Sequence, residues 1–396
     1  MKKGCEYIML REIGNKNIQK IPASATVAMG IRAKALKEQG ADVISLAGGE
    51  PDFDTPELIR NAAKEALDRG RTHYAAGTGI KELREAIAAK MRRENSIDAS
   101  ADNIIVTPGG KFGLYMIMQA LLNDGDEVML ITPAWVSYAP MIMANGGKVV
   151  PVETTPEEGF RITKEKLYSA VTDRTKLLIL CSPSNPTGHV IDEAEGKIIA
   201  DFLEETGIYL IADEMYERLW YKYPPFSVGS IPKVKDQVIT VMGFSKAYAM
   251  TGWRLGWLHV PTHLSKLFAN LYSQEVTCTP AFIQDAAVHA FSCEKEVLEM
   301  RNSYEARGRK FVKLLNEIDG VSVEMPDGAF YVWVRIAKDN MTATQICNDL
   351  LEKEYVAGVP GIAFGDTRDE SVRFTFAQAE EDLVEAAARI RAYMEK

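Results

Sequence analysis

Cysteine is scarce in this sequence, and its few copies are not spaced as structural or metal-binding sites require. There are five cysteines among 396 residues, an odd number without any CxxC pair: Cys5, Cys181, Cys278, Cys293 and Cys347. Neither a disulfide framework nor a zinc site fits this pattern, and we expect no metal ion. The pattern instead favours a reducing compartment, and the cytoplasm is the expected location.

The sequence also lacks long apolar runs and an excess of positive charge. No run approaches the 18 apolar residues of a membrane span. The start, MKKGCEYIMLREIGNK, is basic, but its apolar stretch is too short for a typical signal peptide. Lys and Arg number 46 against 55 Asp and Glu, a net charge of -9. We therefore expect no general affinity for nucleic acid or anionic membranes.

The residues that are present suit a large folded protein, because 46% are hydrophobic and 26% are charged. Short apolar runs alternate with helical patterns at 104–107, 128–132, 148–152, 177–181, 208–212, 238–242 and 257–260. This rhythm predicts an α/β fold with a mostly parallel, seven-stranded sheet flanked by helices.

Beyond residue 290 the pattern changes. A long charged helix at 294–318 precedes predicted strands at 321–325, 330–336 and 372–376 and predicted helices at 343–353 and 379–394. We interpret 56–292 as a large domain and 293–396 as part of a smaller α+β domain. Residues 1–55 would supply an N-terminal arm and the rest of that small domain.

Polar residues follow several predicted strands, where open α/β sheets bind their ligands. The segment TPGGK (107–111) would place an anion at a helix N-terminus, although glycine there also fits an ordinary turn. Phe112 stands where a Walker A loop needs Ser or Thr. Asn185, in SPSNPTG, could belong to a rigid turn. Asp213 closes the fifth run, either as a helix cap or as a group aimed into the crevice.

Lys246 and Arg254 form the most specific local pattern. They follow the sixth run in GFSKAYAMTGWR, a stretch without other charges. An isolated lysine at a strand end is most often a surface residue. However, desolvation and a neighbouring cation both lower the pKa of an amine and favour the nucleophilic free base.

With these motifs in place, the chain resembles the class I/II aminotransferases of the pyridoxal-phosphate fold type I superfamily, in the aspartate-aminotransferase-like branch. The resemblance covers essentially the whole length. It rests on several ordered motifs at matching separations: GEPDFDTP (49–56), HYAAGTGIKELREAIA (73–88), GGK (109–111), PAWVSY (133–138), SPSNPTG (182–188), ADEMY (212–216), SKAYAMTGWRLGW (245–257), GAFYVW (328–333) and Val372-Arg373.

The resemblance implies a pyridoxal 5'-phosphate-dependent aminotransferase that converts an amino acid and a 2-oxo acid by a ping-pong mechanism. Lys246 would form a Schiff base with the cofactor and later move the substrate proton. Asp213 would pair with the pyridine nitrogen. Asn185 and Tyr216 would bind the ring 3′ oxygen, and Trp135 would stack on the ring.

For the cofactor phosphate, the resemblance implies two backbone amides and two side chains: Gly110, Lys111, Ser245 and Arg254. Tyr74 in such enzymes reaches the phosphate of the neighbouring subunit, so a homodimer with shared active sites is implied. Some relatives carry a hydroxyl residue three positions before the lysine. This chain has Gly243 there, which leaves one phosphate contact open.

For the substrate, the resemblance implies that Arg373 grips the α-carboxylate, with the Gly49 backbone completing the clamp beside Trp135 and Asn185. Dicarboxylate-using relatives read the second carboxylate with the GGK lysine and polar residues near the N-terminus. These correspond to Lys111 and Thr26, so aspartate with 2-oxoglutarate is the expected pair. Aromatic and neutral amino acids and prephenate stay open as alternatives, since Lys111 could equally contact phosphate or solvent.

Three other functions are alternatives for the same residues. A pyridoxal-phosphate-dependent lyase would share Lys246, Asp213 and Arg254. A regulator that kept the fold usually carries a DNA-binding extension, which we do not expect because the motifs begin near the N-terminus. An α/β hydrolase would need a nucleophile elbow, and GFSKA (243–247) ends in alanine where glycine belongs.

Overall fold

The structure is a computed structural model, and residues 14–396 are described. The expectations for Cys5 and for a signal peptide lie outside the described residues. Among residues 14–396, no helix combines the length and the apolar character needed to cross a membrane.

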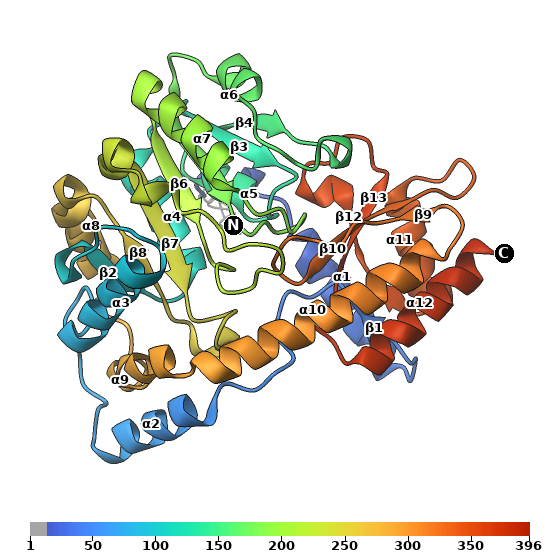
Figure 1. The fold of residues 1–396 in the computed structure, drawn as a ribbon, viewed down its shortest axis with the longest axis horizontal. Helices are drawn as coiled ribbons and strands as arrows, with labels where there is room; N and C mark the ends of the chain where they lie inside the picture. Colours follow the sequence, from blue (N-terminus) through green and yellow to red (C-terminus); the bar gives the residue numbers. More distant parts are fainter. Residues whose placement is uncertain (1–13) are drawn as a thin grey trace, which may run out of the picture.

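A seven-stranded sheet forms the centre of the larger part of the molecule (Figure 1). Its order is β2-β8-β7-β6-β5-β3-β4, and only β8 runs antiparallel to its neighbours. The strands are β2 (Ile104–Thr107), β3 (Glu127–Thr132), β4 (Lys148–Glu153), β5 (Thr175–Cys181), β6 (Tyr209–Asp213), β7 (Val238–Gly243) and β8 (Gly256–His259). The predicted mostly parallel sheet is confirmed, and each predicted run overlaps one of these strands.

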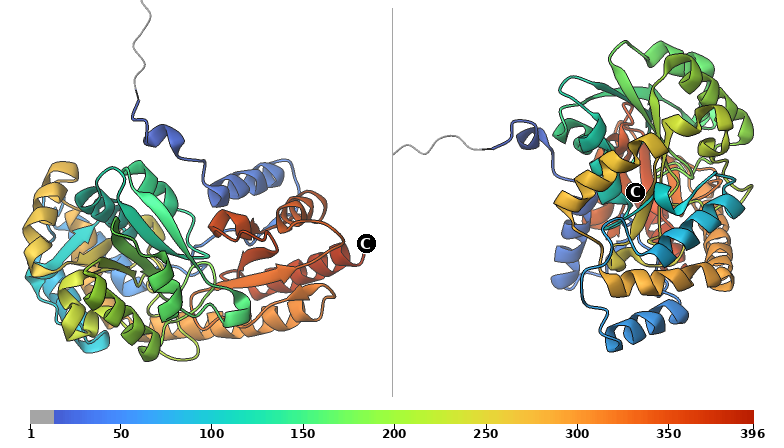
Figure 2. Two further views of the ribbon diagram at one scale, coloured as in Figure 1. Left: turned by 90° about the horizontal axis from the view of Figure 1, so that it is seen from above. Right: turned by 90° about the vertical axis from the view of Figure 1, so that its left-hand side faces the viewer.

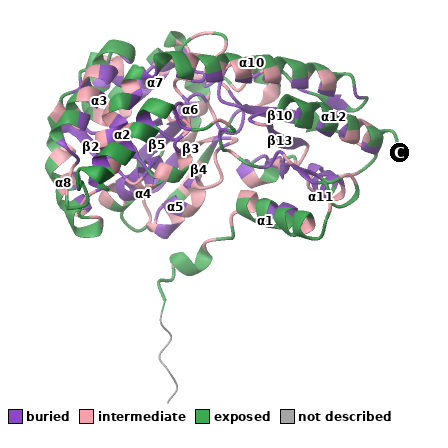
Figure 3. Cartoon of the chain, turned by 90° about the horizontal axis from the view of Figure 1, so that it is seen from below, coloured by how far each residue is buried: buried purple, intermediate pink, exposed green. Residues whose placement is uncertain are grey.

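Helices cover both faces of this sheet, which explains why its strands are apolar at nearly every position. Consecutive residues face opposite sides, so Ile211 packs in one apolar cluster and Leu210 in another. The helices of this part are α2 (Glu57–Asp68), α3 (Lys81–Glu94), α4 (Gly110–Leu121), α5 (Tyr138–Ala144), α6 (Lys164–Ala170), α7 (Glu193–Thr206), α8 (Thr262–Glu275) and α9 (Ala281–Ala287). Figure 3 shows buried strands beneath helices whose outer surfaces are exposed.

The smaller part contains an antiparallel sheet in the order β12-β13-β10-β9. Its elements are β9 (Val321–Ser322), β10 (Tyr331–Ile336), β12 (Val359–Pro360), β13 (Ser371–Thr375), α10 (Glu294–Asn316), α11 (Ala343–Lys353) and α12 (Glu380–Met394). Near the N-terminus, α1 (Ala25–Glu38) packs here too, and β1 (Ile44–Ser45) pairs with β11 (Val356–Ala357). Both chain ends therefore build this part, as predicted, and Figure 2 shows the N-terminal and C-terminal colours side by side.

The domain boundaries predicted from the sequence do not divide any helix or strand. Residue 55 lies between β1 and α2, and residue 292 ends a short helix just before α10. Helix α10 then runs along both parts of the molecule (Figure 1). The division at these residues stays a prediction.

Strand β9 and helix α1 differ from what the sequence predicted. The strand expected at 321–325 ends at Ser322, because the Asn316 side chain bonds both the N–H and the C=O of Val323 and replaces the ladder. Helix α1 lacks an apolar stripe, since only Met29 and Ala33 are buried on it, and periodicity did not reveal it. Short 3₁₀ turns complete the fold: η1 (Ile18–Lys20), η2 (Ala101–Asn103), η3 (Pro156–Glu158), η4 (Val228–Ser230), η5 (Pro232–Gln237), η6 (Thr251–Trp253), η7 (Val288–Ser292) and η8 (Gly361–Phe364).

Candidate active site

A pocket of about 570 Å³ opens at the carboxyl ends of β5, β6 and β7, where the two parts of the molecule meet. Side chains from the seven-stranded sheet, from β10 and β13, and from α1 line it. It brings together twelve of the thirteen residues expected from the sequence: Thr26, Gly49, Gly110, Lys111, Trp135, Asn185, Asp213, Tyr216, Ser245, Lys246, Arg254 and Arg373.

Tyr74 is the residue that the pocket does not include. Its side chain is 87% exposed, on the loop between α2 and α3, and it does not line the cavity. A single chain therefore does not bring Tyr74 to the site.

Lys246 lies just after β7, and its amine points into the pocket. Its Nζ donates to the carbonyl of Gly49, which comes from the segment after β1. Burial lowers the pKa of Lys246 to about 8. The cations of Arg254 and Arg373 lower this pKa further, while Glu50 and Asp213 oppose the shift. Part of the lysine population is therefore the free, nucleophilic amine near neutral pH, as its uncharged sequence surroundings predicted.

Asp213 is the last residue of β6, and its side chain is buried at the floor of the pocket. Its carboxylate accepts from the Tyr138 hydroxyl at 2.6 Å and from the Met215 N–H at 3.1 Å. Burial nevertheless raises the pKa of Asp213 to about 6, because two neutral donors do not replace the lost hydration. The carboxylate would gain from a cationic partner in the pocket.

Arg373, on β13, is a fully buried cation that pairs with no carboxylate among residues 14–396. Its guanidinium donates to Asn185 Oδ1 at 3.0 Å and to the Ala47 carbonyl at 2.6 Å, and it lies 4.5 Å from the Tyr331 ring centroid. Its Nε has no hydrogen-bond partner in the described part of the chain, and burial lowers the pKa of the group. A buried arginine with an unused donor is a ready site for a carboxylate.

The N-terminus of α4 forms a cradle for an anion. The helix begins at Gly110, and no side chain caps its first turn. Gly109 adopts a left-handed φ of 81°, and a Cβ there would lie only 2.6 Å from Arg254 Nη2. The cradle therefore combines free backbone N–H groups with a guanidinium at the place where only glycine fits.

Gly243 bears on the phosphate contact that the sequence left open. A Cβ at this position would lie 3.0 Å from Met215 Cε and 3.2 Å from Gly256 Cα. A hydroxyl residue would need both neighbours to shift, so this chain's packing accounts for the glycine.

Lys111 and Trp135 lie together in the same pocket. The Lys111 ammonium is 4.8 Å from the Trp135 ring centroid, a cation–π contact. Partial burial and the nearby Arg254 lower the pKa of Lys111. Trp135 in turn packs edge-on against Tyr138, with ring centroids 5.3 Å apart. The pocket thus holds a further cation, besides Arg373 and Arg254, that pairs with no carboxylate in the part of the chain that the structure describes.

The sequence did not predict a role in the site for two tyrosines, Tyr331 and Tyr138. The hydroxyls of Tyr216 and Tyr331 lie 2.8 Å apart, and a Cβ on Gly49 would come within 2.4 Å of Tyr331 Oη. Tyr138 binds Asp213, as described above. Both missed residues belong to quoted motifs, PAWVSY and GAFYVW, but their roles depend on partners far away in the sequence.

The fold and this lysine–aspartate–arginine pocket define a class of enzymes, and comparison with known proteins agrees. Residues 41–390 match the family "Aminotransferase class I and II", to which the chain belongs. It is 43% identical to the aspartate aminotransferase of Pyrococcus abyssi, over 88% of this chain and 91% of that protein. It is 41% identical to the aspartate/prephenate aminotransferase of Thermus thermophilus, over 95% and 97%.

Solved structures show the same fold. The aspartate aminotransferase from Thermus thermophilus with maleate superposes with a TM-score of 0.92 at 39% identity, covering 96% of this chain and 99% of that one. The protein is therefore a pyridoxal-phosphate-dependent aminotransferase, whose substrates are amino acids and 2-oxo acids.

The residues in the pocket fit pyridoxal phosphate. The uncapped α4 N-terminus and Arg254 suit its phosphate, and the buried Asp213 lacks a cationic partner that a protonated pyridine nitrogen would provide. Lys246 has the lowered pKa that bond formation with an aldehyde requires.

Proposed function

We propose that this aminotransferase takes dicarboxylic substrates, with aspartate as donor and 2-oxoglutarate as acceptor. The observation that carries the proposal is that the pocket holds two cations, Arg373 and Lys111, besides Lys246 and Arg254, which the cofactor would use. Two cations suit a substrate with two carboxylates. The names of the Pyrococcus and Thermus relatives, and the maleate in the Thermus structure, support the same substrate class.

The chain's own groups would hold the cofactor from several sides. The Gly110 and Lys111 amides, Ser245 and Arg254 would bind the phosphate, and Trp135 would cover one face of the ring. Asn185 and Tyr216 would hydrogen-bond the ring 3′ oxygen, and Lys246 would attach to the aldehyde carbon. When bound, pyridoxal phosphate supplies a conjugated ring that withdraws electrons from the bonds at the substrate Cα.

Asp213 and Lys246 would divide the acid–base work. Asp213, ionised beside a protonated ring nitrogen, would keep the proton on that nitrogen. The Lys246 amine, with its lowered pKa, would take the proton from the substrate Cα and deliver it to C4′ of the cofactor. Both side chains are held by groups of the chain itself, Tyr138 and Gly49.

Arg373 would orient the substrate through its α-carboxylate. Asn185 and the Ala47 carbonyl accept hydrogen bonds from the guanidinium, which also lies over the Tyr331 ring. Gly49 would add its backbone to this clamp. Lys111, together with Thr26 from α1, would bind the second carboxylate.

A homodimer belongs to the same proposal. Tyr74 is 87% exposed and lies outside its own pocket, so we propose that it reaches the cofactor phosphate of a second copy of the chain. Tyr74→Phe should weaken cofactor retention. If Tyr74 acts across the interface, mixing Tyr74→Phe with a Lys246→Ala chain should return a site with both residues intact. Retention unchanged by Tyr74→Phe would contradict this role.

A cytoplasmic location is also proposed. The four cysteines within residues 14–396 are all free, and Cys293 and Cys347 are buried thiols, as a reducing compartment allows. A fluorescent fusion found outside the cytoplasm would contradict this assignment.

Replacing Lys111 by methionine tests the substrate proposal. Methionine keeps the unbranched apolar stem and removes the charge. A charge-assisted bond of about 1.5–3 kcal/mol predicts a loss of about 10- to 150-fold in kcat/KM for aspartate. The values for alanine and phenylalanine should change little. Equal losses for all three donors would mean that Lys111 serves the cofactor and not substrate choice.

Prephenate is the second candidate substrate, because the Thermus relative is named for both aspartate and prephenate. Prephenate also carries two carboxylates, so Lys111 would serve it as well. Measuring prephenate as acceptor with aspartate or glutamate as donor separates the two assignments.

A further inference from the structure

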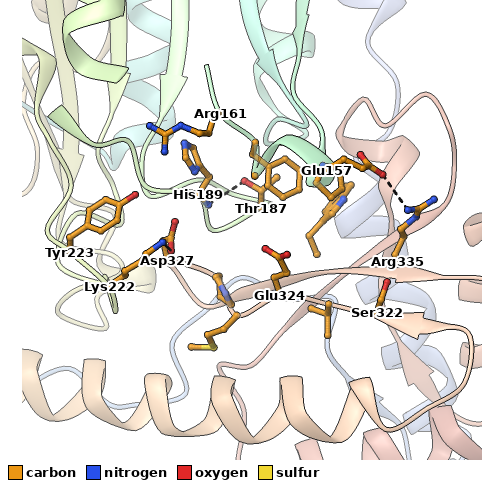
Figure 4. A pocket seen from close by; sticks show the side chains of 17 residues that line it. Glu157, Arg161, Thr187, His189, Lys222, Tyr223, Ser322, Glu324, Asp327 and Arg335 are labelled. Carbon is orange, nitrogen blue, oxygen red and sulfur yellow. Dashed lines mark hydrogen bonds and ion pairs between the residues drawn. The ribbon is translucent and has the colours of Figure 1, made fainter. Parts of the chain in front are cut away.

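A second cavity, of about 530 Å³, lies between the two parts of the molecule and shares no lining residue with the active-site pocket. The larger part contributes the segments that follow β4, β5 and β6, and the smaller part contributes residues 322–327 and two side chains of β10. Figure 4 shows these side chains converging from both parts on the same space.

The strong bases around this cavity are already paired with acids. Arg335 lies 3.2 Å from Glu157, and Arg161 lies 2.7 Å from Asp192. Lys222 is 3.5 Å from Asp327. An anionic ligand would have to compete with these carboxylates for each base.

Glu324 is the exception among the charged lining residues. Within residues 14–396, its carboxylate makes neither a hydrogen bond nor an ion pair. Figure 4 shows the carboxylate of Glu324 projecting into the middle of the cavity, toward Thr187 on the opposite wall. The uncommitted charge of the cavity is therefore negative.

The rest of the lining is partly polar, with Thr187, His189 and Ser322, and partly aromatic and apolar. Phe160, Tyr223 and Trp333 line the cavity together with Met325 and Pro326. Aromatic faces and a polarisable thioether stabilise organic cations, and they offer little to a small hydrated metal ion. The unpaired carboxylate of Glu324 and the aromatic side chains thus both favour an organic cation as the ligand.

We propose that this cavity is a second binding site, for a small organic cation of the guanidinium or ammonium type whose charge pairs with Glu324. The ligand would touch both parts of the molecule, with its charge on the Glu324 side and its apolar portion among the aromatic rings. The proposal is independent of the aspartate assignment, because no residue of the active-site pocket takes part.

Binding of butylguanidinium to the cofactor-loaded enzyme tests the proposal. A guanidinium does not condense with the cofactor aldehyde at neutral pH, and it forms a two-point pair with a carboxylate. Isothermal titration calorimetry at low salt should show one saturable site per chain. Glu324→Gln should weaken binding about fivefold or more. The control Glu381→Gln, an exposed glutamate on α12 outside the cavity, should leave it unchanged.

A second variant predicts an effect of opposite sign. Lys222→Ala frees Asp327 and adds a second unpaired carboxylate, so butylguanidinium should bind more tightly. If the cavity were an anion site, this variant would weaken its ligand instead. Absence of saturable binding, binding that Glu324→Gln leaves unchanged, or weaker binding to Lys222→Ala would each overturn the proposal.

Discussion

Replacing Asp213 by asparagine should stabilise the cofactor-free protein while abolishing its activity. The Asp213 carboxyl is buried, and its pKa is raised to about 6 from an ordinary value of 3.8. The folded chain therefore binds this proton more tightly than the unfolded chain does. This tighter proton binding stabilises the fold fully below pH 3.8, and the stabilisation is lost as the pH rises through 6. At neutral pH the buried carboxylate is ionised and opposes folding.

The size of the effect follows from the two pKa values. At about 1.4 kcal/mol for each pH unit, the difference between the two pKa values means that ionisation of Asp213 destabilises the fold by about 3 kcal/mol at pH 7.5 and about 1 kcal/mol at pH 4.5. Asparagine has one acceptor oxygen for two donors, Tyr138 and Met215, and losing one of these bonds costs about 1 kcal/mol. The net gain should be about 2 kcal/mol at pH 7.5 and close to zero at pH 4.5.

Urea unfolding of the cofactor-free protein at both pH values measures this difference. Asp68→Asn, at the exposed end of α2, serves as the control and should change the free energy of unfolding by less than about 0.5 kcal/mol. A variant that is no more stable than the parent at pH 7.5, or whose advantage persists at pH 4.5, would refute the reasoning. Loss of transaminase activity in the same variant would show that the buried charge serves the cofactor.

Three further substitutions test other parts of the site. Lys246→Ala should remove both the visible absorbance of the lysine-bound cofactor and the activity, and persistence of both would contradict its role. Gly49→Ala should lower kcat/KM about tenfold or more, because the new Cβ meets Tyr331 Oη at 2.4 Å, and adding Tyr331→Phe should restore part of the loss. Asn185→Ala should raise KM for amino and oxo acids about tenfold, because the Arg373 guanidinium loses one of the hydrogen bonds that orient it; an unchanged KM would count against that clamp.

The large sheet and the groups at its strand ends were predictable because both are local patterns. Apolar runs of four or five residues predicted the strands; Asp213 follows such a run directly, and Lys246 comes three residues after the end of β7. The lowered pKa of Lys246 followed from an uncharged stretch around it. These features need no knowledge of the rest of the chain.

The support for these groups was not predictable, because it comes from long-range contacts. Tyr138 binds Asp213 from 75 positions away, and Arg373 binds Asn185 from 188 positions away. The two-residue strands β11 and β12 are too short to leave a pattern, and Tyr74 needs a second chain to have a role. One sequence names these residues through their motifs but does not show what each one touches.

The central claim, that this enzyme moves the amino group of a dicarboxylic amino acid, is tested most directly by one panel of donors. The values of kcat/KM for aspartate, alanine and phenylalanine should be measured with 2-oxoglutarate, and the products identified. We predict the highest value for aspartate, with oxaloacetate and glutamate formed in equal amounts. A higher value for alanine or phenylalanine, or release of ammonia in place of glutamate, would contradict the account.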